Sequence, residues 1–440
     1  MNKSRLLLLP VLVIAFVGYW AAAQTPTGTA AKSVATVPGM PPVIDPSNLY
    51  SETVAGKMSP AVQGALSRIY VPNRRGNSVT VIDPDTMQVV DTYKVGRNPQ
   101  HVVPSWDLRT LWVANNAEGR TDGSLTPIDP LTGKPGPAIP VDDPYNLYWT
   151  PDGKYAIVVA EEHKRLDFRD PQTMKLAFSV KVPGCGGINH ADFSIDGKYA
   201  IFTCEFDGSI AKIDMVNHTV VGTLVLTPFY QRSDVVAQLQ DIISRRPNVV
   251  AQLQAAEKRK PAVVVDSSSE LGGVICATWG MPQDIRISPD GKVFYVADML
   301  ADGVHVVDGD SFRQIGFIPT GIGAHGLYPS RDGKYLYVAN RGSNKLFGPR
   351  HGKGSVSVID FATQKVVAFW PIPGGGSPDM GNVSADGKYL WLSGRFDDVV
   401  YRFNTTTGAV DQIKVGREPH GLAVWPQPGR YSLGHTGNLR

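Results

Sequence analysis

The sequence is poor in cysteine, in unbalanced charge and in long apolar runs. Its 440 residues include 3 cysteines and carry a formal net charge of +3. There is no Cys-x2-Cys pair, which disfavours a structural zinc site, and no Cys-x-x-Cys-His, which excludes covalent c-type haem attachment. A net charge this small gives no argument for nucleic acid as a partner. Beyond the N-terminal segment, no stretch is apolar enough to span a bilayer.

Several common catalytic motifs are also missing. The sequence has no Gly-x-Ser-x-Gly, no Gly-x4-Gly-Lys-Ser/Thr, no Gly-x-Gly-x-x-Gly that opens a helix and no His-Glu-x-x-His. These absences argue against the hydrolase, nucleotide-binding and zinc-protease classes that use those motifs. The chain is 42% hydrophobic and 19% charged, with 45 glycines and 34 prolines. That composition is typical of a packed protein with many turns.

The N-terminal residues have the pattern of an export signal. A positive start, an apolar core and a small-residue cleavage site follow in order at Lys3 and Arg5, residues 6–17 and residues 21–23. We predict a signal peptide over 1–23 and a periplasmic or secreted protein with no membrane span after cleavage. An uncleaved anchor is the alternative, since Tyr19 and Trp20 suit a membrane interface. Residues 24–59, rich in Thr, Ala, Pro and Gly, predict a flexible lead-in.

A repeated six-residue motif is the most informative feature that the sequence contains. Near-copies of Ser-Pro-Asp-Gly-Lys-Tyr begin at Thr150, Ser194, Ser288, Ser330 and Ser384, and a worn copy begins at Ser105. The period is roughly 40 to 50 residues, which is typical of propellers and solenoids. Each repeat reads as four short strands divided by Asn, Asp and Gly turns, and four-stranded units repeated radially make a propeller.

Seven blades can be counted, and one of them is split between the chain ends. Residues 68–96 give three strands without an inner strand, while Pro419 to Trp425 read as an inner strand without partners. Pairing the two removes an open sheet edge. We therefore predict an all-β, seven-bladed β-propeller over 60–428 and a C-terminal tail over 429–440. An insertion at 227–280 interrupts the period, and its apolar spacing predicts short helices.

These residues resemble the YVTN-type β-propeller repeat family of exported bacterial proteins. The Asp-Gly-Lys-Tyr turns, Tyr337-Val338-Ala339-Asn340 and the Val-Ile-Asp-Pro strand ends carry the resemblance. It covers nearly all of the mature chain and implies the fold more strongly than an activity. More distantly, the repeat is similar to the propellers of d1-haem nitrite reductase and nitrous oxide reductase. That similarity implies a redox-linked role, but no cofactor residue of those proteins can be carried over to this sequence.

The first residues of the inner strands form a ring at one end of the central channel. Alternation along a strand places His101, His190 and Asp284 in one register, and His325, Asp379 and His420 in the adjacent one. Two imidazoles and a carboxylate can hold a divalent metal such as copper, or can act as acid and base. A hydrated channel lining without function is the third interpretation.

The cysteines predict a second cluster near the same end of the channel. Cys185, Cys204 and Cys276 precede or adjoin inner strands of neighbouring blades. In an oxidising compartment they predict one disulfide and a free thiol, and a soft-metal site with histidine is the alternative.

Two functional classes follow from these patterns. The first is an exported scaffold, expected to be monomeric, that binds a protein partner, a metal or a small polar cofactor at the upper mouth of the channel. It would be accessory to periplasmic redox chemistry. The second is a metal-dependent oxidoreductase or lyase that uses the His/Asp ring. The sequence leaves open whether the protein is an enzyme.

Overall fold

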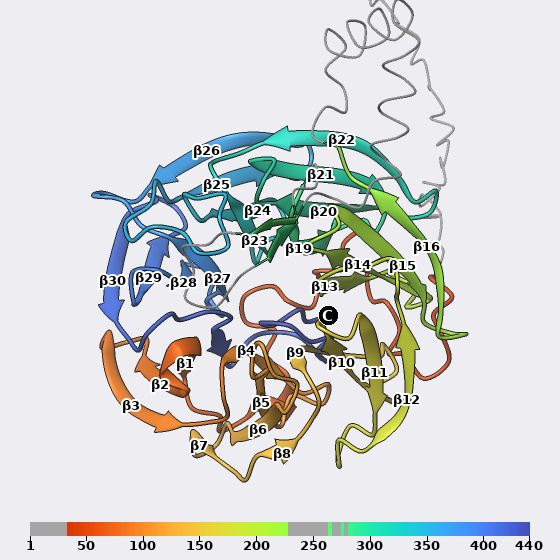
Figure 1. Cartoon of the computed structure of the whole chain (residues 1–440), viewed down its shortest axis with the longest axis horizontal. Coiled ribbons are helices and arrows are strands. Elements are labelled where there is room, and N and C mark those ends of the chain that lie inside the picture. The colour runs from red at the N-terminus through yellow and green to blue at the C-terminus, as the bar shows by residue number, and fades with distance from the viewer. Residues whose placement is uncertain (1–32, 228–262, 266–273, 277–279) are drawn as a thin grey trace, which may run out of the picture. The chain divides into compact units, whose positions relative to one another are not determined.

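Seven antiparallel sheets, six of them built from consecutive short strands, are arranged around a common centre (Figure 1). The computed structural model describes residues 33–227, 263–265, 274–276 and 280–440. The inner strands β4, β9, β13, β19, β23 and β27 lie nearest the centre, and β3, β12, β16, β22, β26 and β30 lie at the rim. The prediction of a seven-bladed propeller is confirmed.

The strands occur in the order that the sequence repeat predicts, four short strands to a blade. Blade 1 contains β1 (Arg68–Asn73), β2 (Ser78–Asp83), β3 (Gln88–Lys94) and β31 (Ala423–Trp425). Blade 2 contains β4 (Pro99–Pro104), β5 (Leu111–Asn115), β6 (Ser124–Asp129), β7 (Lys134–Pro135) and β8 (Ile139–Pro140). Blade 3 contains β9 (Pro144–Trp149), β10 (Ala156–Ala160), β11 (Arg165–Arg169) and β12 (Leu176–Lys181). Blade 4 contains β13 (Ile188–Phe193), β14 (Tyr199–Cys204), β15 (Ser209–Asp214) and β16 (Thr219–Val225).

The remaining three blades repeat the same order. Blade 5 contains β19 (Pro282–Ile287), β20 (Val293–Asp298), β21 (Gly303–Asp308) and β22 (Arg313–Pro319). Blade 6 contains β23 (Ala324–Pro329), β24 (Tyr335–Asn340), β25 (Ser355–Asp360) and β26 (Lys365–Pro371). Blade 7 contains β27 (Pro378–Val383), β28 (Tyr389–Gly394), β29 (Val399–Asn404) and β30 (Val410–Lys414). Two 3-10 turns, η1 (Pro60–Val62) and η2 (Arg74–Gly76), flank β1.

The repeated Asp-Gly turn joins the first strand of a blade to the second through side-chain hydrogen bonds. In one copy the Ser194 hydroxyl donates to Asp196 at 2.8 Å and accepts from the backbone N–H of Tyr199 at 3.1 Å. Gly197 has a φ of +76°, a left-handed value that favours glycine. The worn copy keeps its Ser-Asp hydrogen bond at 2.6 Å but places Leu108 at a φ of +64°. The turn therefore depends more on the serine and the aspartate than on the glycine.

The split blade closes as predicted. β31 pairs with β1 in antiparallel register, with Trp425 opposite Arg68 and Ala423 opposite Tyr70. Trp425 is 1% exposed and packs in a core cluster that β1, β2 and β4 share. The C-terminal strand thus covers the edge that β1 would otherwise expose.

Two segments that the sequence analysis assigned no packing role lie against the propeller. From residue 33 onward the lead-in packs on blades 4 and 5: Leu49 donates its N–H to Pro289 at 2.8 Å, and the buried Tyr50 hydroxyl donates to Ile287 at 2.6 Å. The predicted tail is buried too, with Tyr431, Leu433 and Leu439 each 2% exposed. In both segments apolar side chains are buried against the strands, and this burial stabilises the packed position of the segments.

The predicted helices of the insertion lie outside the described residues. Within 227–280 the structure describes a strand pair, β17 (Val263–Val265) with β18 (Val274–Cys276). In the part of the chain that the structure describes, no helix is long and apolar enough to cross a membrane.

Candidate site at the channel mouth

β-bulges at the start of the inner strands place two successive residues in the channel. In β23, Ala324 pairs with Asn340 and Leu327 with Val338, so one extra residue is accommodated between them. The same register shift occurs in β4, β13, β19 and β27. A bulge re-aims side chains at the end of a sheet. As a result, the two predicted registers form two side-chain clusters rather than facing opposite ways.

The first cluster, called the mouth cluster below, surrounds Asp379. Its other members are His325 of β23, His420 just before β31, and Arg341 and Arg395, which directly follow β24 and β28. His325 Nδ1 lies 3.0 Å from Asp379 Oδ1, and His420 Nδ1 donates to Asp379 Oδ2 at 2.8 Å. The structure therefore brings together the three residues that the sequence grouped, and Asp379 is 0% exposed.

Two guanidinium groups complete the mouth cluster. Arg341 donates to Asp379 through Nε at 3.1 Å and Nη2 at 2.9 Å, and to His325 Nε2 at 2.8 Å. Arg395 Nη1 lies 3.6 Å from Asp379 Oδ2 and 3.4 Å from His420 Nε2. The predicted ring included neither arginine.

These neighbours fix the charge states in the mouth cluster. Burial alone would raise the pKa of Asp379, but Arg341, His325 and His420 hold it well below its usual range. Burial and then Arg341 lower the pKa of His325 well below its usual range, and burial lowers that of His420 to about 4. A carboxylate already neutralised by guanidinium groups attracts a metal cation weakly. This arrangement disfavours a metal ion on His325, Asp379 and His420.

The second cluster, called the inner cluster below, lies one residue further along each inner strand. It contains two predicted residues, His101 and His190, together with Asn146 and a residue that the sequence analysis left out, His435. All four are 0% exposed. The ring centroids of His101 and His190 are 5.3 Å apart, and those of His190 and His435 are 4.5 Å apart. Asn146 Nδ2 lies 3.1 Å from His190 Nδ1 and 3.0 Å from His435 Nδ1.

Asp284, the third predicted member of this register, is paired with an arginine instead. Arg286 donates to Asp284 Oδ1 at 2.8 Å, and the N–H groups of Ile285 and Leu327 each donate to the carboxylate at 2.9 Å. Burial nevertheless raises the pKa of Asp284. Its Oδ1 lies 3.6 Å from His435 Nε2, so it adjoins the inner cluster.

The C-terminal tail brings His435 to the channel. Gly434 bridges to Tyr148, and the His435 N–H donates to Leu147 at 2.9 Å. The tail is also held by Asp192, which accepts from Asn438 at 2.8 Å and Arg440 at 2.5 Å. Sequence periodicity could not find this residue, because the tail belongs to no repeat. The alternation of Tyr431 and Leu433 was the available sign that the segment is buried.

A hollow of about 80 Å³ opens beside the mouth cluster. Its lining comes from the starts of inner strands and the loops after second strands: Gln100, Asn116, Glu118, Tyr145, Glu161, Glu205, Phe206, Gln283, His325, Arg341, Leu346, Phe347 and Arg395. A second hollow of about 260 Å³ shares Phe347 and Arg395 with it and adds Arg75, Arg350 and Arg417. The loops after second strands thus line two adjoining hollows.

Two glutamates give the smaller hollow an unusual charge balance. Burial and the neighbouring Glu205 raise the pKa of Glu161 well above its usual range. Burial also raises the pKa of Glu205, although Gln283 donates to it at 3.0 Å and Asn189 at 2.8 Å. Protonated carboxyl groups can donate hydrogen bonds as well as accept them.

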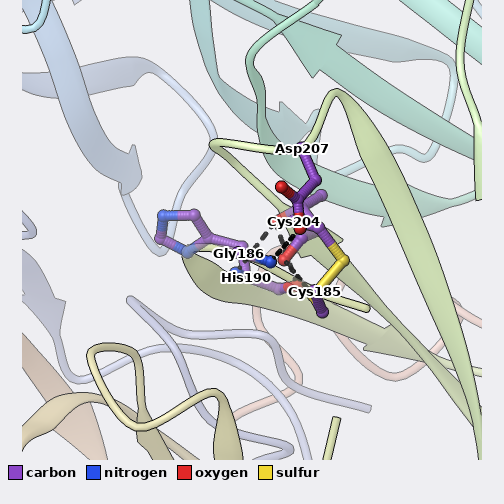
Figure 2. Close-up of a disulfide and its surroundings, with 6 residues drawn as sticks. Cys185, Gly186, His190, Cys204 and Asp207 are labelled. Carbon is purple, nitrogen blue, oxygen red and sulfur yellow. Dashed lines mark hydrogen bonds between the residues drawn. A yellow bond between two sulfur atoms is a disulfide. The ribbon is translucent and has the colours of Figure 1, made fainter. Parts of the chain in front are cut away.

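Two of the three cysteines form a disulfide, Cys185–Cys204, with a Cα–Cα distance of 4.8 Å. Figure 2 shows it beside the start of β13, with the imidazole of His190 pointing away from the sulfur atoms. Ile188 of β13 pairs with Cys204 of β14, so the bridge ties the segment before β13 to the end of β14. Cys276 ends β18.

Comparisons with known proteins agree with the fold. A model of the YNCE-like β-propeller family matches residues 242–428. Antigen Lp49 of Leptospira interrogans is 36% identical over 130 residues, which cover 27% of this chain and 27% of the antigen. The chain therefore matches about a quarter of that relative's length.

Solved structures share the propeller at low sequence identity. Hydrazine synthase of Kuenenia stuttgartiensis has a TM-score of 0.51 and 19% identity over 81% of this chain and 94% of that one. The dihydro-haem d1 dehydrogenase NirN, in complex with DHE, has a TM-score of 0.52 and 14% identity over 81% and 75%. A 6-phosphogluconolactonase-like protein of Bacteroides uniformis has a TM-score of 0.56 and 17% identity over 81% and 99%. Similarity at this level shows the fold alone.

The hollow beside the mouth cluster is by itself too small for a haem-like macrocycle. A drug-sized ligand needs a pocket of about 300 Å³ or more, whereas the hollow beside the mouth cluster measures about 80 Å³. The resemblance seen in the repeats is nevertheless confirmed at the level of the scaffold: the chain is a seven-bladed β-propeller whose residues 242–428 match the YNCE-like β-propeller family.

Proposed function

We propose that this protein is a binding propeller whose channel mouth holds a small polar ligand with an anionic group. The observation that carries the proposal is Arg395, which lines both hollows. The Nε atom of Arg395 is buried without a hydrogen-bond partner. Arg395 Nε lies 3.6 Å from Glu418 Oε1, and Arg395 Nη1 lies 3.6 Å from Asp379 Oδ2. Those distances are too long for good hydrogen bonds. A ligand carboxylate could take the bidentate position that the guanidinium offers.

The other lining groups favour a ligand that also carries a hydroxyl or amine. The Oε1 atom of Gln100 is a buried acceptor without a partner, and Glu205 lies on the same wall. A buried acceptor gains most from a donor that it lacks. A hollow of about 80 Å³ has room for roughly five to eight water-sized atoms. Hydroxy or amino carboxylates of two to four carbons match both the size and the polarity.

Calorimetric titration with lactate, alanine and acetate tests this proposal. We expect lactate or alanine to bind, and Arg395→Gln to weaken that binding by about tenfold or more, since a charge-assisted bidentate contact is lost. Arg402→Gln is the matched control, because Arg402 pairs with Asp411 at 2.6 Å on blade 7, outside the hollow's lining. The proposal fails if no probe binds, or if both variants bind as the wild type does.

We further propose that the protein acts outside the cytoplasm, accessory to redox chemistry there. The export signal pattern at 1–23, the Cys185–Cys204 disulfide and the fold shared with hydrazine synthase and the d1-haem dehydrogenase support this location. N-terminal sequencing of the exported form should give a start near Gln24. An intact Met1 in a cytosolic fraction would contradict the proposal.

The metal-dependent alternative is not favoured at the mouth cluster. Arg341 and Arg395 occupy the space around Asp379 that a cation would need. Any metal chemistry has to be sought at the inner cluster, where the imidazoles have different neighbours.

A further inference from the structure

We propose that His101, His190 and His435 form a tris-imidazole site for a divalent transition-metal ion such as Zn²⁺ or Cu²⁺. The proposal is independent of the ligand proposed for the mouth. It rests on a side-chain cluster that joins β4 of blade 2, β13 of blade 4 and the C-terminal tail. Imidazole is a preferred ligand of both ions.

The three imidazoles lie close together, and each has a ring nitrogen without a hydrogen-bond partner, as a metal site requires. Each can offer one ring nitrogen such that the three nitrogens lie within 4.8 Å of one another. The Nε2 atoms of all three are buried and have no hydrogen-bond partner. A buried polar atom without a partner costs about 1–3 kcal/mol, so three in one place need an explanation. A shared metal ion would satisfy all three together.

His101 already has the orientation of a metal ligand. Its Nδ1 lies 3.0 Å from the carbonyl oxygen of Tyr145. A neutral imidazole that donates from Nδ1 to a carbonyl carries its lone pair on Nε2. Metal-bound histidines usually hold their second nitrogen in this way.

Asn146 can set the same tautomer in the other two histidines. Its amide group lies 3.1 Å from His190 Nδ1 and 3.0 Å from His435 Nδ1. In the structure Asn146 Oδ1 accepts from the N–H of Leu147 at 2.9 Å, so a rotation of the amide that exchanges its oxygen and nitrogen gives up that hydrogen bond. With the oxygen toward the rings, Asn146 would accept from both Nδ1–H groups, which leaves both Nε2 lone pairs free for a metal. One side chain would thus position two ligands.

The electrostatic surroundings of the inner cluster suit a cation better than those of the mouth cluster. All three imidazoles are 0% exposed, and burial disfavours the charged form of an imidazole. The nearby Arg286 is paired with Asp284. Asp284 Oδ1 lies 3.6 Å from His435 Nε2, and its pairing with Arg286 leaves the two side chains close to neutral together.

A small contraction would bring the nitrogens to bonding geometry. With metal–nitrogen bonds of about 2.0–2.1 Å and tetrahedral angles, ligand nitrogens lie about 3.4 Å apart. The three ring nitrogens now lie within 4.8 Å of one another, so the longest distance between them has to shorten by up to about 1.4 Å. Because the His435 N–H is bonded to Leu147 of β9, the shortening has to come from side-chain rotations of the three imidazoles.

The test uses the full mature chain, treated with chelator and then incubated overnight with Zn²⁺ or Co²⁺. Overnight incubation is needed because the ligands are 0% exposed. We expect about one equivalent of metal per chain, and with Co²⁺ the intense visible absorption of a tetrahedral site. His435→Gln and His190→Gln should each weaken binding by about 100-fold or more, since even changes beside a metal ligand cost 10–100-fold. His325→Gln, in the mouth cluster, should bind as the wild type does.

Two further measurements keep the proposal falsifiable if a variant is unstable. The melting temperature of each variant is taken in chelator, so that loss of folding is separated from loss of metal. Asn146→Asp should strengthen binding by about tenfold, because a carboxylate accepts from both Nδ1–H groups. Metal-free wild type after incubation, or equal affinity in the His435→Gln and His325→Gln variants, would overturn the site. Weaker binding by Asn146→Asp would overturn the role of Asn146.

Discussion

The mouth cluster and the inner cluster contain the same kinds of residue and have opposite chemistry. Both have buried histidines from successive positions of the inner strands. At the mouth, Arg341 and Arg395 neutralise Asp379, and the imidazoles make hydrogen bonds to charged partners. In the inner cluster the histidines meet one another and an amide, and three Nε2 atoms have no partner. The number of histidines alone therefore does not predict a metal site, because neighbouring arginines such as Arg341 and Arg395 disfavour a metal cation.

Removing residues 417–440 should have the largest effect, since it removes His420 from one cluster and His435 from the other. It also deletes β31 and leaves β1 as an open edge. An unpaired edge strand promotes aggregation. We expect no soluble monomer on size-exclusion chromatography. A truncated protein that stays monomeric with unchanged melting would mean that neither the closing strand nor the tail is needed for the fold.

Asp379→Asn should destabilise the protein by about 3–5 kcal/mol, because removing one partner of a buried ion pair leaves the other charge uncompensated. Asp379 is 0% exposed and Arg341 is 2% exposed, so water does not replace the lost contact. Urea denaturation measures the change. Asp411→Asn, at an exposed pair with Arg402, should change stability by less than about 1 kcal/mol. Similar values for both variants would show that the mouth cluster is not electrostatically organised.

The double variant Cys185→Ala, Cys204→Ala should lose about 3 kcal/mol, the entropy expected for a closed loop of this size. The two residues are 19 apart in sequence. Because the bridge adjoins β13, which carries His190, we expect metal affinity at the inner cluster to fall while ligand binding at the mouth is unchanged. Equal losses at both sites would indicate general loosening of blade 4.

Acidification should give a smaller effect, and its sign follows from the lowered pKa values. His420 has a pKa of about 4 in the folded protein and about 6.5 when unfolded. Unfolding therefore binds a proton below pH 6.5, and stability falls as the pH falls toward 4. Between pH 7.5 and 6.0 this histidine accounts for about 0.8 kcal/mol. His420→Gln should reduce the measured pH dependence by that amount, and an unchanged pH dependence in this variant would contradict the assignment.

The sequence predicted the scaffold well because the scaffold is periodic. The Asp-Gly turns fix where each inner strand begins, so the positions of His101, His190, His325 and Asp379 at the channel follow from counting back. The closing strand followed from an unpaired strand at each end. These inferences use only local hydrogen bonds and strand alternation.

The chemistry of the site was less accessible, for physical reasons that particular residues illustrate. Arg341 and Arg395 lie on loops, and nothing in a loop's sequence says that its arginine will fold back onto Asp379. His435 lies in a tail outside the repeat, so its path depends on tertiary contacts such as Arg440 with Asp192. The bulges that turn both registers inward are likewise set by blade packing.

The position of β31 and the tail has a consequence for biosynthesis. The ring closes through residues 423–425, and His435 reaches the channel ten residues later. A ribosome makes these segments after every blade, and an export machine that moves chains from the N-terminus delivers them last. Blades 2 to 7 can form while the chain emerges, but neither histidine cluster can be complete until then. Assembly of both clusters therefore waits until the last residues of the sequence have emerged.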